Sequence, residues 1–199
     1  MDAITPASPE ITSSQVKMSP PGKRASTSSS SSSARTPTKR ILAELSAYAS
    51  SPSPVITSLA PISHSNILSL RAVLSGAHLP PSTGYSTGRF LLSIIVPPNY
   101  PLSPPTITFV TRICHPNVKF ETGEICLDVL KENWTPILGV VGALESVARL
   151  LEEPGTDSPL NVDCAALLRE GDFIGARGLV GFYCEEERFV GELKEDEER

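Results

Sequence analysis

The apolar residues of this chain follow a helical period in two separate parts of the sequence. In KRILAELSAYAS, residues 39–50, positions 41, 42, 45 and 48 fall on one helical face, and SPSP ends the helix. The same period returns beyond Trp134, where apolar positions 137–151 predict a largely buried helix that stops before Pro154. Two further helices are expected over residues 162–168, with Asn161 as N-cap and Gly171 as the stop, and over residues 173–189.

Four strand-like segments lie between the first predicted helix and the second. They are Val55–Ile62, Asn66–Leu74, Arg89–Val96 and residues 105–113, separated by proline and polar positions. Short connections between consecutive strands favour an antiparallel meander. The order of an N-terminal helix, four strands and three C-terminal helices predicts an α+β fold, since βαβ units would alternate.

Composition divides the chain into a core and two flanking segments. Residues 1–37 consist mainly of Ser, Thr, Pro and Ala, and such a segment cannot bury enough apolar surface to fold. We therefore expect a disordered tail over 1–37, a folded domain over 38–190 and an acidic end over 191–199.

Charge and hydropathy exclude several classes of function. The net charge of −5 arises in residues 185–199, which carry eight acidic and three basic side chains, so nothing favours nucleic-acid binding. No window approaches the roughly 18 apolar residues of a membrane span, and the N-terminus lacks a secretory signal. These features favour a cytoplasmic protein.

The four cysteines, at positions 114, 126, 164 and 184, lie far apart in the sequence. They form no CxxC pair and have no histidine at metal-ligand spacing, which argues against a metal site. Because disulfides are rare in the cytosol, we expect four free thiols.

Cys126 lies in the longest segment without a clear period, residues 114–136. Long irregular segments in compact domains are usually functional or disordered, and the apolar residues of this one need burial: Ile125, Leu127, Val129, Leu130 and Trp134. Three interpretations remain open for the thiol. It is a small core residue, a nucleophile in thioester exchange with the Asn117 amide supporting the oxyanion, or half of a hydrolytic pair with His115. The HPN stretch also suits a turn braced by hydrogen bonds.

Four blocks in a fixed order resemble the signature of ubiquitin-conjugating enzymes: PPNYPLSPPTITFVTRICHPNV, GEICLDVL, NWTP and DSPLNVD. The resemblance runs from about Lys39 to Phe189. It implies that Cys126 accepts ubiquitin as a thioester from the activating enzyme and that Asn117 stabilises the oxyanion or braces the loop. It gives His115 and Pro116 a supporting role. Asp157 and Ser158 fall in the loop beside the active site, and relatives often carry an acid where this chain has Ser158.

The resemblance also implies partner surfaces. Lys39 and Arg40 match first-helix residues that contact the activating enzyme, while Leu102, Pro136 and Ile137 match the two loops that contact RING-type ligases. Leu102 stands where phenylalanine is common. No cofactor is expected, because ATP is consumed upstream by the activating enzyme.

VKFETGEICLDVLKENWTP, LLEEPGTDSPLNVD and AALLREGD are similar to the peroxisomal branch of the family in fungi. That similarity implies transfer of ubiquitin to the peroxisomal import receptor for its recycling in matrix-protein import. It also implies a membrane-anchoring peroxin as partner, with recruitment to the cytosolic face of the peroxisomal membrane. The alternatives are a general cytosolic conjugating enzyme acting on lysines, a binding-only protein of the same fold, and an enzyme for another ubiquitin-like modifier.

Overall fold

The computed structural model describes residues 36–155, 157 and 159–193, without the side chain of Val129. Its helices are α1 (Pro37–Ser50), α2 (Gly139–Glu152), α3 (Val162–Arg169) and α4 (Phe173–Glu186). The strands are β1 (Ile56–Ser63), β2 (Asn66–Ser75), β3 (Arg89–Ile95) and β4 (Thr106–Phe109), with short 3-10 turns η1 (Gly76–His78), η2 (Pro81–Thr83) and η3 (Asp128–Leu130). Residues 1–35 of the predicted tail, residues 194–199 of the predicted acidic end, Thr156 and Ser158 lie outside the described residues.

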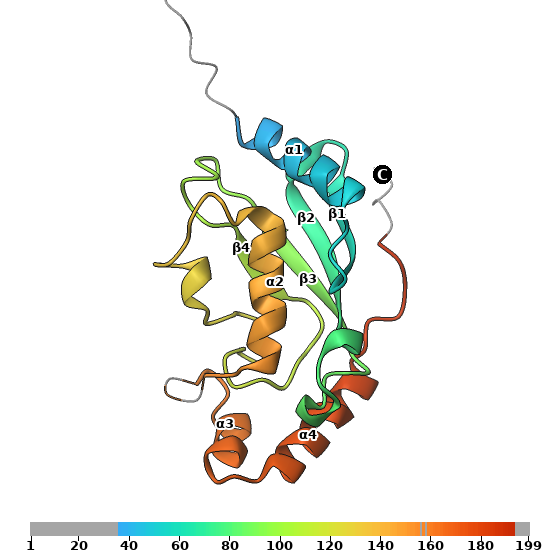
Figure 1. Ribbon diagram of the computed structural model, residues 1–199, viewed down its shortest axis with the longest axis vertical. Helices are drawn as coiled ribbons and strands as arrows, with labels where there is room; N and C mark the ends of the chain where they lie inside the picture. The colour runs from blue at the N-terminus through green and yellow to red at the C-terminus, as the bar shows by residue number, and fades with distance from the viewer. Residues whose placement is uncertain (1–35, 156, 158, 194–199) are drawn as a thin grey trace, which may run out of the picture. The chain divides into compact units, whose positions relative to one another are not determined.

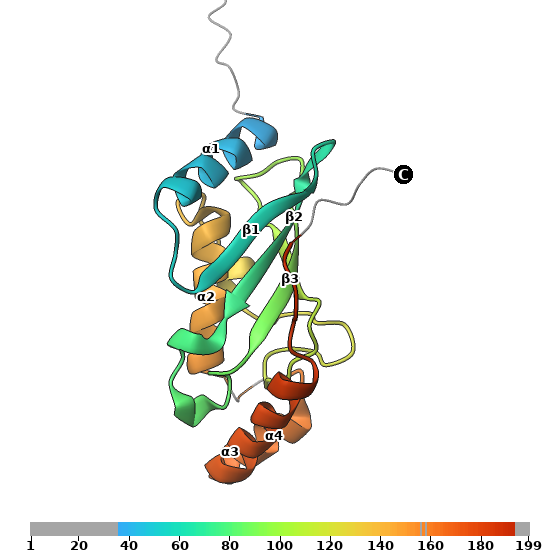
Figure 2. The same ribbon diagram turned by 90° about the vertical axis from the view of Figure 1, so that its right-hand side faces the viewer.

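The four strands form one antiparallel sheet in the order β1-β2-β3-β4, which confirms the predicted meander and the α+β class. Ala72 pairs with Leu92, and Leu92 pairs with Phe109, so alternate side chains of neighbouring strands enter the same core. α1 and α2 lie on one side of the sheet, and α3 and α4 lie together at one end of it (Figures 1 and 2). The apolar stripe of α2, centred on Leu144 and Val147, is fully buried.

Two helix starts differ from the predicted ones. α1 begins at Pro37, which the predicted boundary assigned to the tail, because the Thr36 side chain accepts a hydrogen bond from the Lys39 N–H and proline suits the first turn. α2 begins at Gly139, so Ile137 lies in the preceding turn and is 93% exposed. The prediction that the buried stripe includes Ile137 was wrong.

Two other elements are shorter than predicted. β4 ends at Phe109. Beyond it, the Leu91 N–H of β3 donates to the Thr111 hydroxyl oxygen and not to a backbone carbonyl, so the ladder stops. α4 ends at Glu186, where successive glutamates at a helix C-terminus oppose the helix dipole. α3 was predicted within one residue, with Asn161 capping it and Gly171 following it in the left-handed region.

Candidate active site

Cys126 follows a short hairpin-like turn that is attached to β4. Val118 and Ile125 form an antiparallel bridge, and the Cys126 N–H donates to the Asn117 carbonyl at 2.8 Å. The Phe109 N–H donates to the Gly123 carbonyl at 2.9 Å, which joins the tip of the turn to the sheet. The buried Ile125 side chain holds the turn in the core, and the next residue, Cys126, is half-buried. The turn therefore keeps the thiol at the surface on a fixed backbone.

Gly123 allows this turn to approach the sheet closely. Its φ of +69° is in the left-handed region, and a Cβ atom there would lie 1.9 Å from the Phe109 carbonyl oxygen. No other residue type fits this position without displacing the turn.

His115 is fully buried, and both of its ring nitrogens are engaged. Nε2 donates to the Leu150 carbonyl at 2.9 Å, and Nδ1 accepts the Asn117 N–H at 3.0 Å. Burial lowers the pKa of His115 to about 4, although the bond to Leu150 opposes this shift. The imidazole is therefore neutral at physiological pH and joins the turn to α2. Neither nitrogen is available to take a proton from Cys126, which removes the basis for a hydrolytic pair.

Asn117 and Pro116 hold the two ends of the segment over residues 155–161, which contains the predicted gate. The Asn117 side chain is 7% exposed; its Nδ2 donates to the Gly155 carbonyl and its Oδ1 accepts the Gly155 N–H, both at 2.8 Å. The Pro116 carbonyl accepts the N–H groups of Leu160 and Asn161 at 2.8 and 3.0 Å. The backbone that carries Cys126 and the ends of this segment are therefore fixed to the same turn.

Asp157 is exposed, two residues beyond the contact between Asn117 and Gly155. Its predicted neighbour at the gate, Ser158, lies outside the described residues. A different charged group reaches the thiol: Lys131 Nζ lies 3.9 Å from Cys126 Sγ.

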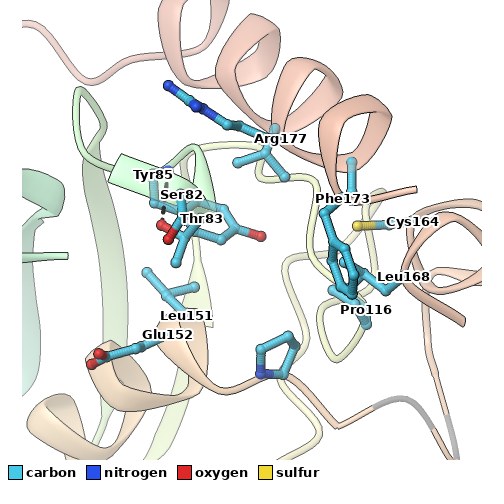
Figure 3. Close-up of a pocket in the computed structure, with 13 residues that line it drawn as sticks. Ser82, Thr83, Tyr85, Pro116, Leu151, Glu152, Cys164, Leu168, Phe173 and Arg177 are labelled. Atoms are coloured by element: carbon cyan, nitrogen blue, oxygen red, sulfur yellow. Dashed lines mark hydrogen bonds between the residues drawn. The ribbon is translucent and has the colours of Figure 1, made fainter. Parts of the chain in front are cut away.

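A cavity of about 290 Å³ lies behind the HPN turn (Figure 3). Its walls come from Tyr85, from Leu151 at the end of α2, and from Leu168 and Phe173 of α3 and α4, with Pro116 at one side. Cys126, Asn117 and Asp157 do not line it. The cavity is therefore separate from the candidate site, which lies on the surface, where a large partner can approach.

The predicted partner residues lie on connected elements. Arg40 donates from Nη2 to the Pro136 carbonyl at 2.7 Å, and the Trp134 indole N–H donates to the Pro101 carbonyl at 2.8 Å. The first bond joins the start of α1 to the turn with Pro136, and the second joins the segment before that turn to the loop with Leu102. Lys39, Pro136, Leu102 and Ile137 are exposed, the last two by 79% and 93%, and neither apolar side chain packs in the core.

Sequence reasoning missed Glu44, Gly155 and Lys131. Glu44 accepts hydrogen bonds from Arg40, from the Tyr100 hydroxyl and from the Val140 N–H, so it connects α1, the loop before β4 and the start of α2. The spacing of Arg40 and Glu44 predicts a pair within one helix turn, but it carries no signal for the contacts to other elements.

The fold and the surface thiol define a protein of the ubiquitin-conjugating class, and comparison with known proteins agrees. The family model described as "Ubiquitin-conjugating enzyme" matches residues 40–173. This chain belongs to the ubiquitin-conjugating enzyme family, and it is accordingly a transferase whose partners are ubiquitin, an activating enzyme and a ligase.

Relatives from several lineages have peroxin names. The chain is 42% identical over 163 residues to the ubiquitin-conjugating enzyme E2 PEX4 of Gibberella zeae, covering 81% of this chain and 94% of that protein. It is 47% identical over 125 residues to the E2 enzyme pex4 of Dictyostelium discoideum, covering 63% of this chain and 82% of that protein. Protein PEROXIN-4 of Arabidopsis thaliana is 43% identical over 118 residues, which are 59% of this chain and 73% of that protein.

A solved structure has the same fold. It is the crystal structure of the H. polymorpha ubiquitin-conjugating enzyme Pex4p in complex with the soluble domain of Pex22p, with a TM-score of 0.70 and 32% identity. The match covers 76% of this chain and 98% of that one. Among the described residues, no helix combines the length and hydropathy that crossing a bilayer demands.

Proposed function

We propose that this chain accepts ubiquitin as a thioester on Cys126 and transfers it to the peroxisomal import receptor, for recycling in matrix-protein import. The similarity to peroxins named PEX4 and peroxin-4 carries the peroxisomal part of the proposal. The half-buried thiol, on a residue whose backbone N–H donates to the Asn117 carbonyl, supports the assignment of Cys126 as the nucleophile.

The reaction consists of two successive acyl transfers. The Cys126 thiolate attacks the carbonyl of the thioester carried by the activating enzyme. A C–S bond to Cys126 forms, and the cysteine of the activating enzyme leaves as a thiolate. In the second step the acceptor attacks the same carbonyl, and Cys126 leaves as a thiolate. No cofactor takes part in either step.

Asn117 has two roles in this proposal. One hydrogen of Nδ2 is used by the Gly155 carbonyl, and the second remains able to donate to the oxyanion of each step. The bonds to Gly155 meanwhile hold the start of the 155–161 segment, in which we place Asp157 and Ser158 as the entrance for the acceptor.

The proposed partner surfaces rest on the family resemblance of the sequence. We assign Lys39 and Arg40 to the activating enzyme, and Leu102, Pro136 and Ile137 to a RING-type ligase. A relative of known structure is in complex with the soluble domain of Pex22p, which supports a peroxin as partner. In our proposal a membrane-anchoring peroxin recruits the chain to the cytosolic face of the peroxisomal membrane.

The choice of acceptor separates this proposal from a general conjugating enzyme. Charged protein is mixed with free cysteine or free lysine at equal concentration, and the loss of the thioester is followed on a non-reducing gel. We expect faster discharge to cysteine, because a thiol near neutral pH supplies more nucleophile than an amine. Because free cysteine is the more reactive acceptor for any thioester, a conjugating enzyme of the family that acts on lysines is assayed in parallel as the control. A cysteine-to-lysine ratio no higher than that enzyme's would argue against the receptor-cysteine assignment.

A further inference from the structure

The turn that precedes Cys126 has a second attachment besides the one to the sheet. Residues 118–125 form this turn, and Phe120 lies near its tip. The Phe120 ring packs edge-to-face against the ring of Tyr183 in α4, with the two ring centroids 5.0 Å apart. Through its carbonyl, Gly123 joins the same tip to β4. The tip is therefore held from two directions, by a strand through its backbone and by a helix through a side chain.

Tyr183 is the fixed side of this contact, because it belongs to a helix and packs against the main apolar core. Phe120 is half-buried, and Arg112 also lies over it, with the guanidinium carbon 5.9 Å from the ring centroid. The ring is thus enclosed between a helix and an arginine side chain. The tip of the turn cannot move away from α4 without breaking both contacts.

The turn is short, so a displacement of its tip reaches the thiol. Val118 and Ile125 form its antiparallel bridge, and directly after it the Cys126 N–H donates to the Asn117 carbonyl at 2.8 Å. Cys126 and Asn117 are therefore the opposite end of the ladder whose tip contacts α4. In acyl transfer, a misplacement of the reacting groups by about 1 Å costs about 10²-fold in rate. The orientation of the ladder thus controls how Cys126 Sγ lies relative to the Asn117 side chain.

We propose that Phe120 is a positioning residue for acyl transfer. Through its contact with Tyr183 it fixes the turn, so that Cys126 and Asn117 keep the separation that the reaction requires. Phe120 takes no part in the chemistry itself and acts through the backbone of the turn. Because the expected effect is on transfer by Cys126, the inference rests on the proposed function of that residue.

The test measures the discharge of the full chain in a single turnover. The protein is charged with ubiquitin, the activating enzyme is stopped, free cysteine is added, and the loss of the thioester gives a rate constant. The spontaneous rate, measured on charged protein unfolded in urea, is subtracted. A variant with a lower folded fraction forms less thioester, which reduces the amplitude of the reaction but not its rate constant. The rate constant therefore reports the position of the reacting groups and not the stability of the fold.

Phe120→Ala removes the ring, and we expect the rate constant to fall by about tenfold, within the loss that a misplacement of about 1 Å produces. Phe120→Tyr and Tyr183→Phe keep both rings and should discharge at the wild-type rate. Phe189→Ala is the matched control. Phe189 is also half-buried with an arginine over its ring, since the Arg89 guanidinium carbon lies 5.6 Å from the centroid, but Arg89 belongs to β3 and not to the turn. Its variant should keep the wild-type rate constant.

Two further variants examine the contact itself. Phe120→Leu keeps most of the apolar volume and replaces the alanine variant if that protein does not fold; its rate constant should also fall, but by less. Phe120→Ala combined with Tyr183→Leu should discharge no more slowly than the slower of the two single variants, because each of them already removes the contact between the rings.

The opposite results overturn the proposal. A wild-type rate constant in Phe120→Ala, or in Phe120→Leu if the alanine variant does not fold, rejects the positioning role. An equal loss in Phe189→Ala, or fully additive losses in the double variant, rejects the contact with Tyr183 as its cause. In each of these cases the thioester on Cys126 still forms, so the proposed function stands. If the wild-type chain forms no thioester, the proposed function fails, and the positioning role fails with it.

Discussion

Asn117 connects three features of the site through one residue. Its carbonyl accepts the Cys126 N–H, its backbone N–H donates to His115, and its side chain holds Gly155. An asparagine is suited to this position because its amide donates and accepts at once, which an aspartate or a leucine of similar size does not.

Replacement of the Asn117 side chain should show separately how much it stabilises the loop and how much it speeds discharge of the thioester. Asn117→Ala removes both bonds to Gly155, and we expect it to lower the free energy of unfolding by about 1–2 kcal/mol. Loss of the oxyanion donor should slow discharge by about 10²-fold or more. Urea unfolding and single-turnover discharge measure the two effects. If discharge remained at the wild-type rate, the oxyanion role of Asn117 would be wrong.

His115 makes stability depend on pH. Its folded pKa of about 4 lies below the ordinary value of 6.5, so the unfolded chain binds a proton at a higher pH than the folded one. The residue's contribution is therefore complete above 6.5 and is lost as the pH falls toward 4. We expect the free energy of unfolding to fall by about 2 kcal/mol from about pH 7.5 to about pH 5 through this residue.

The matched variant is His115→Gln, whose amide can still donate to Leu150. It should be less stable at neutral pH, but its stability should vary less with pH over the same range. Chemical denaturation at several pH values measures both. Equal slopes for the two proteins would contradict the assignment of a buried, neutral His115.

At the scale of elements, Glu44 joins α1 to the start of α2. The carboxylate accepts the Val140 N–H at 2.8 Å and so caps α2 from another helix, and it also accepts the Tyr100 hydroxyl. The pKa of Tyr100 is raised, mainly by burial and to a smaller extent by the hydrogen bond to Glu44. Because Arg40 binds both Glu44 and the Pro136 carbonyl, the proposed ligase surface depends on the same carboxylate.

Glu44→Ala removes the carboxylate that accepts hydrogen bonds from the Tyr100 hydroxyl, the Arg40 guanidinium and the α2 N-terminus. We expect a loss of about 2–4 kcal/mol in the free energy of unfolding, and a smaller loss for Glu44→Gln, which still accepts. Thermal or urea unfolding of both variants tests this. If Glu44→Ala were within about 0.5 kcal/mol of wild type, a range typical of surface substitutions, the network would not couple the two helices.

The turn before Cys126 offers a second test at this scale. Gly123→Ala places a methyl group against the Phe109 carbonyl at a positive φ, and we expect a loss of about 2 kcal/mol or more together with slower charging. A Cβ atom added at Gly178 of α4 would meet no neighbouring side chain or other element within 4 Å. Gly178→Ala should therefore gain about 0.5–1 kcal/mol through helix propensity. Similar effects of the two substitutions would show that close approach at Gly123 does not matter.

At the scale of the whole molecule, the periodic segments could be predicted from sequence. The meander and α3 lie where period and punctuation place them, because proline, glycine and polar positions separate their apolar segments. The ends that differ, at Pro37, Phe109 and Glu186, are determined by single contacts or charges that periodicity does not contain.

The candidate site was predictable only in part. Cys126 and Asn117 stand out by their place in an irregular stretch and by the family resemblance. Two contacts of the site, Gly155 with Asn117 and Lys131 with Cys126, depend on backbone reversals in segments that have no period. Neither contact therefore follows from the sequence.

The measurement that most directly tests the function is charging of the wild-type chain beside Cys126→Ser, with ubiquitin, activating enzyme and ATP. We expect a wild-type adduct that a thiol reductant cleaves, and a serine adduct that resists the reductant but is cleaved by mild alkali, because an oxygen ester has replaced the thioester. A reductant-sensitive adduct on Cys126→Ser, or none on the folded wild-type protein, would contradict the assignment of Cys126 as the acceptor of ubiquitin.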